Sequence, residues 1–443
     1  MKWIIAFLIF SLLILFHEYG HFLVAKMSGV TVEEFSLGFG PRLLTTVYKG
    51  TRYSVKLLLF GGSCQMKGEL DEYDEETGQW VESGAGPEEG SFQSVSRGKR
   101  AAIVFAGPLF NFLLAFIGAV IVIGVVGYDP AEVLYVAPGS PAAEAGLAEG
   151  DMITEFMGQR VVIGRDVSSW SIFHDLTEDT ELSMTYERDG EKHSIVFDPY
   201  TTVRYMMGIN YNLDEPQAVI QAVSEGAPFA EAGGMAGDVV ISINGNEITT
   251  SQSMNEYFDA NPMDGSEMNI VVLRDGSEVT LTFTPVESRS LSAGFSYNLG
   301  RVNTSPIGVI RYSLTEVRYW IQTVVRSLAA MFTGRFGVQD LSGPVGVVDI
   351  VSTTYEETKE EGPLMTWMNM INLIILLSAN LGVMNLLPIP GVDGGRLLFL
   401  AIEAIRRRPM DRKVEMITQT VALGFLVILM VVVMYNDILR LIG

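Results

Sequence analysis

Residues 3–22 read WIIAFLIFSLLILFHEYGHF, an apolar run that ends in two histidines and a glutamate. A helix needs roughly 20 mostly apolar residues to cross a bilayer, and this run has that character from Trp3 onward. A lysine before the run is typical of a signal peptide, but no small-residue cleavage site follows it. We therefore expect a retained membrane helix that carries ionisable groups within it.

Three further stretches are long and apolar enough to cross a membrane, at about 101–127, 369–388 and 414–435. Of the 443 residues, 48% are hydrophobic and only 19% are charged, a balance typical of membrane proteins. The sequence thus predicts a polytopic α-helical membrane protein with four transmembrane helices, the first at about 3–25.

Charge is concentrated in the middle of the chain. Residues 128–365 hold 13 Lys and Arg against 35 Asp and Glu, and the difference of −22 equals the net charge of the whole protein. Lysines and arginines gather before the second helix and between the third and fourth, which predicts that these two loops are cytoplasmic. The acidic segment and both termini are then outside, and the single cysteine, Cys64, falls on the cytoplasmic side. The pattern gives no sign of nucleic-acid binding, which requires basic patches.

Between the first two helices, residues 31–67 alternate apolar and polar side chains and are broken by glycines, which predicts membrane-associated strands with turns. Residues 69–96 are acidic and rich in Gly and Ser, which predicts a flexible loop. Residues 307–335, in the connector before the third helix, place apolar residues at helical spacing with arginines among them. This pattern fits an interfacial amphipathic helix or a plain core helix.

The acidic segment contains an internal repeat. Residues 136–153 and 223–240 are identical at nine of eighteen positions, at an offset of 87 residues. Each copy continues into strand-like residues, a helical piece and a hairpin signalled by Asp-Gly. We expect a small α+β domain present twice, either as a binding module or as a purely structural one.

His17 and His21 carry the first chemical signal. Four residues apart on a helix, they lie on one face a single turn apart, a spacing that suits two imidazoles on one zinc ion. Glu18 between them is placed to act as general base. Two satisfied polar residues on a helix are the alternative, but the chain has only four histidines and ionisable groups in membrane helices are costly. About 14 apolar residues precede the motif, which puts the site roughly 20 Å from the outer face, nearer the cytoplasm.

A catalytic zinc ion needs a third protein ligand. His174 and His193 lie in the acidic outer segment, across the membrane from the motif, and we expect them at the surface. Asp393 follows a stretch in which the third apolar helix is interrupted by Pro388 and Pro390. Broken membrane helices are tolerated where they line a cavity, and an aspartate there is a candidate oxygen ligand.

Several segments in combination resemble the site-2 protease family of intramembrane zinc metalloproteases. They are HEYGH (17–21), FSLGFGPRLL (35–44), GKRAAIVFAGPLFNFLLA (98–115), LSGPVGV (341–347) and NLLPIPGVDGG (385–395). The two repeats in turn are similar to bacterial PDZ domains, which bind extended peptides. The resemblance spans nearly the whole chain.

The resemblance implies a Zn²⁺ cofactor, with His17, His21 and Asp393 as its ligands and Glu18 as the catalytic base. It also implies that a further set of residues contacts the substrate, with the strand-like segment around 53–66 presenting an edge to an unwound substrate helix. That set is Asn385, Pro388, Pro390 and Asn111. For Asn111, a helix-packing amide is the alternative.

By the same resemblance, the expected domains follow one another along the chain. Residues 1–127 form the first two transmembrane helices with the HExxH motif and a cytoplasmic-side β region, and 128–205 and 206–290 form two PDZ-like domains. Residues 291–365 form a juxtamembrane amphipathic connector, and 366–443 form the third and fourth transmembrane helices with the NxxPxPxxDGG motif.

The expected function is regulated intramembrane proteolysis in the bacterial inner membrane. Substrates would be single-span membrane proteins, such as a pre-cleaved anti-sigma factor, and remnant signal peptides. The PDZ-like domains would be periplasmic, and the active site would face the cytoplasmic side. Two other classes of protein remain: a non-catalytic zinc-binding scaffold that displays PDZ domains, and a metal transporter. Glu18 argues against the scaffold, and the scarcity of polar residues in the second and fourth helices argues against the transporter.

Overall fold

The computed structural model describes residues 2–68, 72–74, 79–81, 88–213, 215–408, 410 and 412–442. The flexible loop expected at 69–96 falls largely outside these residues. The chain divides into two units, each described by itself below. The first comprises Met1–Ala131, Arg160–His174 and Asn298–Gly443, and the second comprises Glu132–Gln159 and Asp175–Tyr297.

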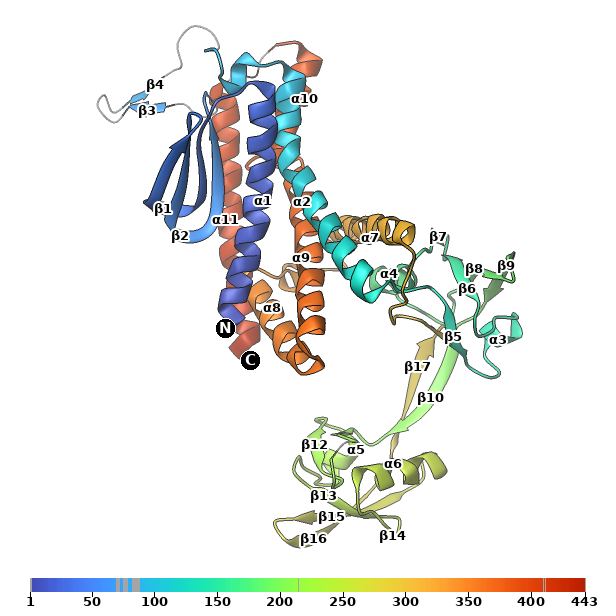
Figure 1. The fold of residues 1–443 in the computed structure, drawn as a ribbon. Coiled ribbons are helices and arrows are strands. Elements are labelled where there is room, and N and C mark those ends of the chain that lie inside the picture. Colours follow the sequence, from blue (N-terminus) through green and yellow to red (C-terminus); the bar gives the residue numbers. More distant parts are fainter. Residues whose placement is uncertain are drawn as a thin grey trace. The chain divides into compact units, whose positions relative to one another are not determined.

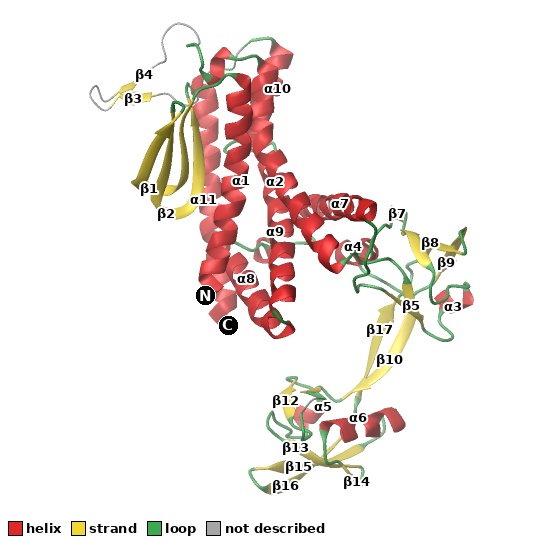
Figure 2. Ribbon diagram, in the orientation of Figure 1, coloured by secondary structure: helices red, strands yellow, loops and turns green. Residues whose placement is uncertain are grey.

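Long apolar helices dominate the first unit (Figures 1 and 2). They are α1 (Lys2–Ser28), α2 (Arg97–Val126), α9 (Pro363–Leu386) and α11 (Arg412–Ile442). Within the described residues, four helical stretches are long and apolar enough to cross a membrane: Ile5–Ser28, Arg97–Val126, Pro363–Leu386 and Ile417–Leu441. Apolar side chains such as Leu8, Val421 and Phe425 stay exposed, which is the pattern of helices that meet lipid.

The helix ends differ from the sequence expectation by a few residues, for identifiable reasons. The second helix begins at Arg97 because the Ser96 side chain accepts a hydrogen bond from the Lys99 amide and so caps it. The third ends at Leu386 because Pro388 disfavours helical backbone at the residue before it. After it the chain forms α10 (Asp393–Arg406), a helix that the hydropathy pattern did not indicate.

The predicted strands between the first two helices are β1 (Val32–Tyr48) and β2 (Thr51–Met66). Their pairing is antiparallel and doubles back: Phe35 pairs with both Tyr53 and Cys64. Residues 32–39 therefore lie between two halves of β2, and the last part of β2 forms an edge. Short strands β3 (Glu72–Asp74) and β4 (Gln79–Val81) pair beyond it.

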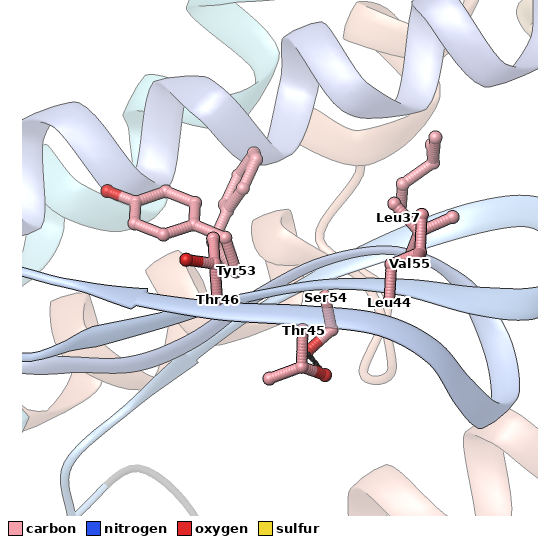
Figure 3. Close-up of a pocket in the computed structure, with 8 residues that line it drawn as sticks. Leu37, Leu44, Thr45, Thr46, Tyr53, Ser54 and Val55 are labelled. Atoms are coloured by element: carbon pink, nitrogen blue, oxygen red, sulfur yellow. Dashed lines mark hydrogen bonds between the residues drawn. The ribbon is translucent and has the colours of Figure 1, made fainter.

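One face of this sheet is apolar and packs toward α1. The Phe35 ring lies 5.2 Å from the ring of Phe22 on α1, and the Tyr53 ring lies 6.1 Å from it. A pocket of about 350 Å³ opens at the sheet, and Figure 3 shows Leu37 and Val55 among the side chains that line it. On the other side of the ribbon in Figure 3, the Thr45 and Ser54 hydroxyls form a hydrogen bond of 3.4 Å.

The connector contains helices α7 (Pro306–Phe332) and α8 (Pro344–Thr358). One face of α7 buries Ser313, Glu316 and Tyr319, whereas Ile307 and Phe332 are 84% and 93% exposed. Exposed apolar residues on one face favour the interfacial helix over the plain core helix, and this assignment stays a prediction.

Two buried polar contacts secure this part of the first unit. Arg165 on α4 (Gly164–Phe173) donates to the carboxylates of Asp129 and Glu316. Burial by itself lowers the pKa of Arg165, but the charges and hydrogen bonds of these two carboxylates outweigh it and raise that pKa above the usual arginine value. On α11, the buried carboxylate of Asp437 accepts hydrogen bonds from the amides of Gly343 and Gly346 at the start of α8. A carboxylate at a helix N-terminus is favoured by the free N–H groups there.

The second unit contains the repeat. Its two four-stranded sheets have the same order, β7-β6-β8-β9 and β14-β13-β15-β16. The strands of the first are β6 (Met152–Phe156), β7 (Gln159–Arg160), β8 (Leu182–Arg188) and β9 (Glu191–Phe197). Those of the second are β13 (Val239–Ile243), β14 (Asn246–Glu247), β15 (Met268–Arg274) and β16 (Ser277–Phe283). Short helices α3 (Pro141–Glu144) and α5 (Pro228–Glu231) precede these sheets, and α6 (Ser251–Ala260) lies between β14 and β15.

The Asp-Gly hairpins are type I′ turns in both copies. Asp189 and Gly190 have φ of 52° and 82°, and Asp275 and Gly276 have φ of 48° and 79°. Positive φ at both central residues matches the twist of the flanking strands. The repeat and its hairpins, predicted from sequence, are thus confirmed.

Each copy also holds the same ion pair, in which the aspartate is buried and the arginine is partly exposed. The Asp238 carboxylate accepts two hydrogen bonds of 2.7 Å from Arg274, and Asp151 accepts two of 2.6 and 2.7 Å from Arg188. Both aspartates are 1% exposed. The Arg274 guanidinium holds the pKa of Asp238 below its usual range.

The second copy is inserted between two long paired strands, β10 (Tyr200–Met206) and β17 (Val286–Ser292), which lie side by side in Figure 1. Its own small sheet pairs β11 (Ile209–Tyr211) with β12 (Ile220–Val223). After β17, strand β18 (Phe295–Tyr297) pairs with β5 (Val133–Val136), which precedes the first copy. The domain boundaries expected from sequence follow one another along the chain and do not include this pairing of β18 with β5. Local sequence patterns do not report pairing between strands so far apart in the chain.

Candidate metal centre

Helix α1 presents His17 and His21 to helix α2, and each is 8% exposed. Glycines let the two helices approach closely at this point. A Cβ atom on Gly107 would lie 2.3 Å from Nε2 of His21 and 2.7 Å from Cε1 of His17, and one on Gly20 would lie 2.4 Å from the Ala106 carbonyl oxygen. Small residues at membrane helix crossings permit such close approach. Both imidazoles thus pack directly against Gly107, in space that a side chain at this position would fill.

Asp393 is brought to the histidines by the turn between α9 and α10. Gly391 in this turn has φ of 99°, a conformation that favours glycine. Asp393 is then the first residue of α10, and two more glycines follow it. A Cβ atom on Gly394 would lie 2.1 Å from the Leu387 carbonyl oxygen, and one on Gly395 would lie 2.3 Å from that of Ile389. The DGG sequence therefore allows the start of α10 to pack directly on the preceding turn.

Three side-chain atoms meet in a nearly equilateral triangle. Nε2 of His17 lies 3.2 Å from Nε2 of His21, and Oδ2 of Asp393 lies 3.2 Å and 3.3 Å from these two nitrogens. Within the described residues, this is the group of His, Cys, Asp and Glu side chains whose geometry suits a metal ion.

The triangle fits zinc. Ligands about 2.0–2.1 Å from a tetrahedral zinc ion lie about 3.3 Å from one another, which matches the three measured edges. The buried Oδ2 of Asp393 also has no hydrogen bond of good geometry within the described part of the chain. An acceptor left in this way is suited to bind a cation. Three protein ligands and an open fourth position are the arrangement of catalytic zinc sites.

The far side of the His21 ring is fixed by α2. Its Nδ1 lies 2.8 Å from the Ile103 carbonyl oxygen, which accepts only, so Nδ1 carries the hydrogen. Nε2 then keeps its lone pair toward the triangle. A backbone carbonyl on the outer ring nitrogen is a common way to orient a metal-binding histidine.

Glu18 is half-buried and lies beside the sheet. A Cβ atom on Gly62 would be 3.4 Å from Cγ of Glu18, which places this glutamate against Gly62 of β2. Residues 62–66 pair with 32–37 on one side, and within the described residues no strand pairs with their other side. The candidate base therefore lies next to the edge strand of this sheet.

The residues expected to contact the substrate fall in two places. Asn385 in the last turn of α9, Pro388 and Pro390 lie on the segment that leads to Asp393, with Pro388 exposed and the other two half-buried. Their role stays a prediction. Asn111 on α2 is fully buried, and its amide nitrogen lies 3.1 Å from Nδ1 of His17.

The two other histidines are surface residues and do not belong to this group. His174 is exposed, and its ring stacks on Trp170 at 5.0 Å. His193 is exposed on β9 and stacks on Tyr186 at 5.3 Å. Neither belongs to the metal-binding group found in the described residues.

Sequence reasoning did not identify the residues that anchor α10. The buried carboxylate of Glu403 accepts hydrogen bonds of 2.9 Å from both Arg97 and Arg100 at the start of α2. Glu403 lies ten residues after Asp393 on the same helix, so this clamp holds the helix that carries the third candidate ligand. In the sequence, Arg97 and Arg100 contributed only to the positive charge that predicts a cytoplasmic loop, and no local pattern indicated their pairing with Glu403.

Comparison with known proteins agrees with this geometry. The model of Peptidase family M50 matches residues 5–429. The chain is 30% identical to the Regulator of sigma-W protease RasP of Bacillus subtilis over 457 residues, which cover 99% of this chain and 98% of that protein. It is also 30% identical to the Regulator of sigma-E protease RseP of Escherichia coli over 472 residues, covering 97% of each. The Zinc metalloprotease RasP of Bacillus licheniformis is 29% identical over 459 residues, covering 100% of each.

The chain belongs to peptidase family M50, the site-2 protease family. It is a metalloprotease of the site-2 type, which confirms the enzyme class predicted from sequence and sets aside the scaffold and the transporter. Four long apolar helices together with bacterial relatives support a protein of the bacterial inner membrane.

Proposed function

We propose that this protein is a zinc endopeptidase that cleaves single-span membrane proteins within the bilayer, with His17, His21 and Asp393 as zinc ligands and Glu18 as general base. The observation that carries the proposal is the triangle of ligand atoms, whose edges of 3.2, 3.2 and 3.3 Å match one face of a zinc tetrahedron. The names of several relatives, which call them zinc metalloproteases, support the choice of metal.

Bound zinc would supply the Lewis acidity that makes water a nucleophile at neutral pH and polarises the scissile carbonyl. The protein's own groups do the rest. Glu18 takes the proton of the attacking water and passes it to the leaving amine. His17 and His21 act as ligands through Nε2, and Asp393 adds a negative charge that partly balances the metal.

The sheet supplies a way to hold the substrate. A helix hides its carbonyls in its own hydrogen bonds, so a substrate segment must unwind before it is cleaved. Residues 62–66 form an edge of this sheet near Glu18, and strand addition to such an edge would fix an extended segment. Asn385, Pro388 and Pro390 would contact the same segment from the loop before Asp393.

Substrate class is proposed from the relatives. Two relatives carry the names Regulator of sigma-W protease and Regulator of sigma-E protease, and these names favour anti-sigma factors as substrates. By the family resemblance, such substrates would already be trimmed outside the membrane, and remnant signal peptides would be a further class. The two repeats would act as periplasmic PDZ-like modules that exclude bulky proteins or bind a new C-terminus. The lysines and arginines of the two loops, together with the position of His17 late in the first helix, would place the active site toward the cytoplasmic side.

The test is co-expression with a tagged single-span substrate that carries helix-breaking residues. We expect the parent to release a fragment cut within the membrane segment and Glu18→Gln to leave the substrate intact. Glu357→Gln, an exposed glutamate on α8, is the matched control and should cleave like the parent. Release of the same fragment by Glu18→Gln and by the parent would refute the proposal.

A further inference from the structure

A buried amide stands directly behind one candidate ligand. Asn111 is 0% exposed, and its Nδ2 lies 3.1 Å from Nδ1 of His17. Its other amide atom, Oδ1, is buried and has no hydrogen-bond partner within the described residues. A buried acceptor without a partner is costly, so this side chain calls for an explanation.

This orientation of the Asn111 amide conflicts with metal binding, because it decides which ring nitrogen of His17 carries the hydrogen. An amide N–H₂ group only donates, so Nδ1 of His17 would have to accept, and the ring hydrogen would sit on Nε2. Nε2 is the atom that lies 3.2 Å from both His21 Nε2 and Asp393 Oδ2. A nitrogen that carries a hydrogen has no lone pair for a metal, so this tautomer does not fit the site.

Rotation of the amide by half a turn removes the conflict. Oxygen and nitrogen of an asparagine amide have nearly the same shape, and the surrounding hydrogen bonds decide which is which. With Oδ1 at 3.1 Å from Nδ1 of His17, the oxygen gains a donor and the histidine keeps its hydrogen on Nδ1. Nε2 then presents its lone pair to the triangle.

The second candidate ligand, His21, also has a hydrogen-bond acceptor on α2 next to its Nδ1. Nδ1 of His21 donates to the Ile103 carbonyl oxygen at 2.8 Å. Ile103, Gly107 and Asn111 are spaced by four residues, so they form one stripe along α2. With the amide rotated, this stripe places an acceptor next to Nδ1 of each imidazole, and the glycine between them leaves room for both rings.

We propose that the side-chain oxygen of Asn111 accepts a hydrogen bond from Nδ1–H of His17 and thereby fixes the tautomer and orientation in which Nε2 binds the metal. The inference rests on the proposed zinc site. It gives Asn111 the task of a positioning residue behind the ligand, in place of the substrate contact that the sequence suggested.

A nearby hydrogen bond offers a matched control. The Ser378 hydroxyl on α9 donates to the backbone carbonyl of Asn111 at 2.7 Å, and both groups are buried. Ser378→Ala removes this bond without changing the amide that faces His17. The Ser378→Ala variant therefore measures how much zinc affinity changes when a buried hydrogen bond between α2 and α9 is lost and the contact with His17 is kept.

The experiment measures zinc affinity of the full-length protein in detergent, by competition with a chromophoric chelator. Asn111→Leu removes the acceptor, and loss of an outer partner of a metal-binding histidine typically weakens affinity about 10- to 100-fold. Asn111→Asp keeps an acceptor oxygen and should bind zinc within about threefold of the parent, as should Ser378→Ala. If the leucine variant does not fold, Asn111→Ala takes its place with the same expected loss.

Two results would overturn the inference: parent-like affinity in the variant that lacks the acceptor, or an aspartate variant as weak as that one. Both leave the zinc site itself standing. The zinc site is tested separately in the same assay by His17→Ala, which should abolish tight binding. Parent-like affinity in His17→Ala would refute the proposed function.

Discussion

Replacement of Gly107 by alanine should selectively damage the metal centre. The added Cβ atom would lie 2.3 Å from Nε2 of His21 and 2.7 Å from Cε1 of His17, whereas unstrained contacts between such atoms are about 3.5 Å. The imidazoles would have to withdraw by about 1 Å, several times the roughly 0.2 Å within which metal–ligand distances are held.

The size of the effect follows from the cost of overpacking. An extra carbon in a well-packed site typically costs about 1–3 kcal/mol. If that cost falls on the zinc-bound arrangement, zinc affinity should drop roughly 5- to 140-fold, since about 1.4 kcal/mol corresponds to a factor of ten.

Gly124 on the same helix is the matched control. A Cβ atom there has no heavy atom within 4 Å, and alanine favours helix over glycine by up to about 1 kcal/mol. Gly124→Ala should keep zinc affinity and leave the melting temperature unchanged or raised. The assay is chelator competition on both variants in detergent. Equal zinc affinity for Gly107→Ala and the parent would refute the idea that both imidazoles rest against this glycine.

Two further predictions concern buried carboxylates. Because the folded pKa of Asp238 is depressed, its pair with arginine stabilises the second repeat above the ordinary aspartate range, and this stability is lost as pH falls through the folded pKa. Asp238→Asn should cost about 1–3 kcal/mol, because Arg274 loses its charged partner but still reaches solvent. It should also speed amide hydrogen exchange in β13 and β15 at pH 7, whereas the exposed control Glu278→Gln should not. Unchanged exchange in Asp238→Asn would contradict the assignment. Glu403→Gln leaves two arginines on α2 without their carboxylate, so it should lower the melting temperature of the zinc-free protein and weaken zinc binding less than loss of Asp393 does. A melting temperature and zinc affinity equal to those of the parent would show that this clamp does not hold α10.

Much of the candidate site could be predicted from local patterns in the sequence. Histidines four apart on an apolar helix define a shared face without any knowledge of the rest of the chain. Pro388 and Pro390 mark the break before Asp393, because proline lacks an amide hydrogen and restricts the residue before it. The strand alternation of residues 31–67 and the Asp-Gly hairpins are likewise short-range signals, and the structure contains the strands and turns that they predict.

Contacts between distant segments could not be predicted from these short-range patterns. The doubled pairing of Phe35, the return of β18 to β5 and the clamp from Glu403 to α2 join residues far apart in sequence, which no local period records. The role of Gly107 was hidden for a similar reason. A glycine in an apolar helix has several explanations, and only the helix crossing shows that two imidazoles fill the space above it.

Zinc stoichiometry in purified Asp393→Ala tests the central claim most directly. Asp393 lies more than 370 residues after His21, and the proposed site exists only if the fold joins them. We expect one zinc ion per chain in the parent and in Glu18→Gln, whose substitution spares the three ligands, and substantially less than one in Asp393→Ala. A full complement of zinc in Asp393→Ala would contradict the claim that these segments form a single metal centre.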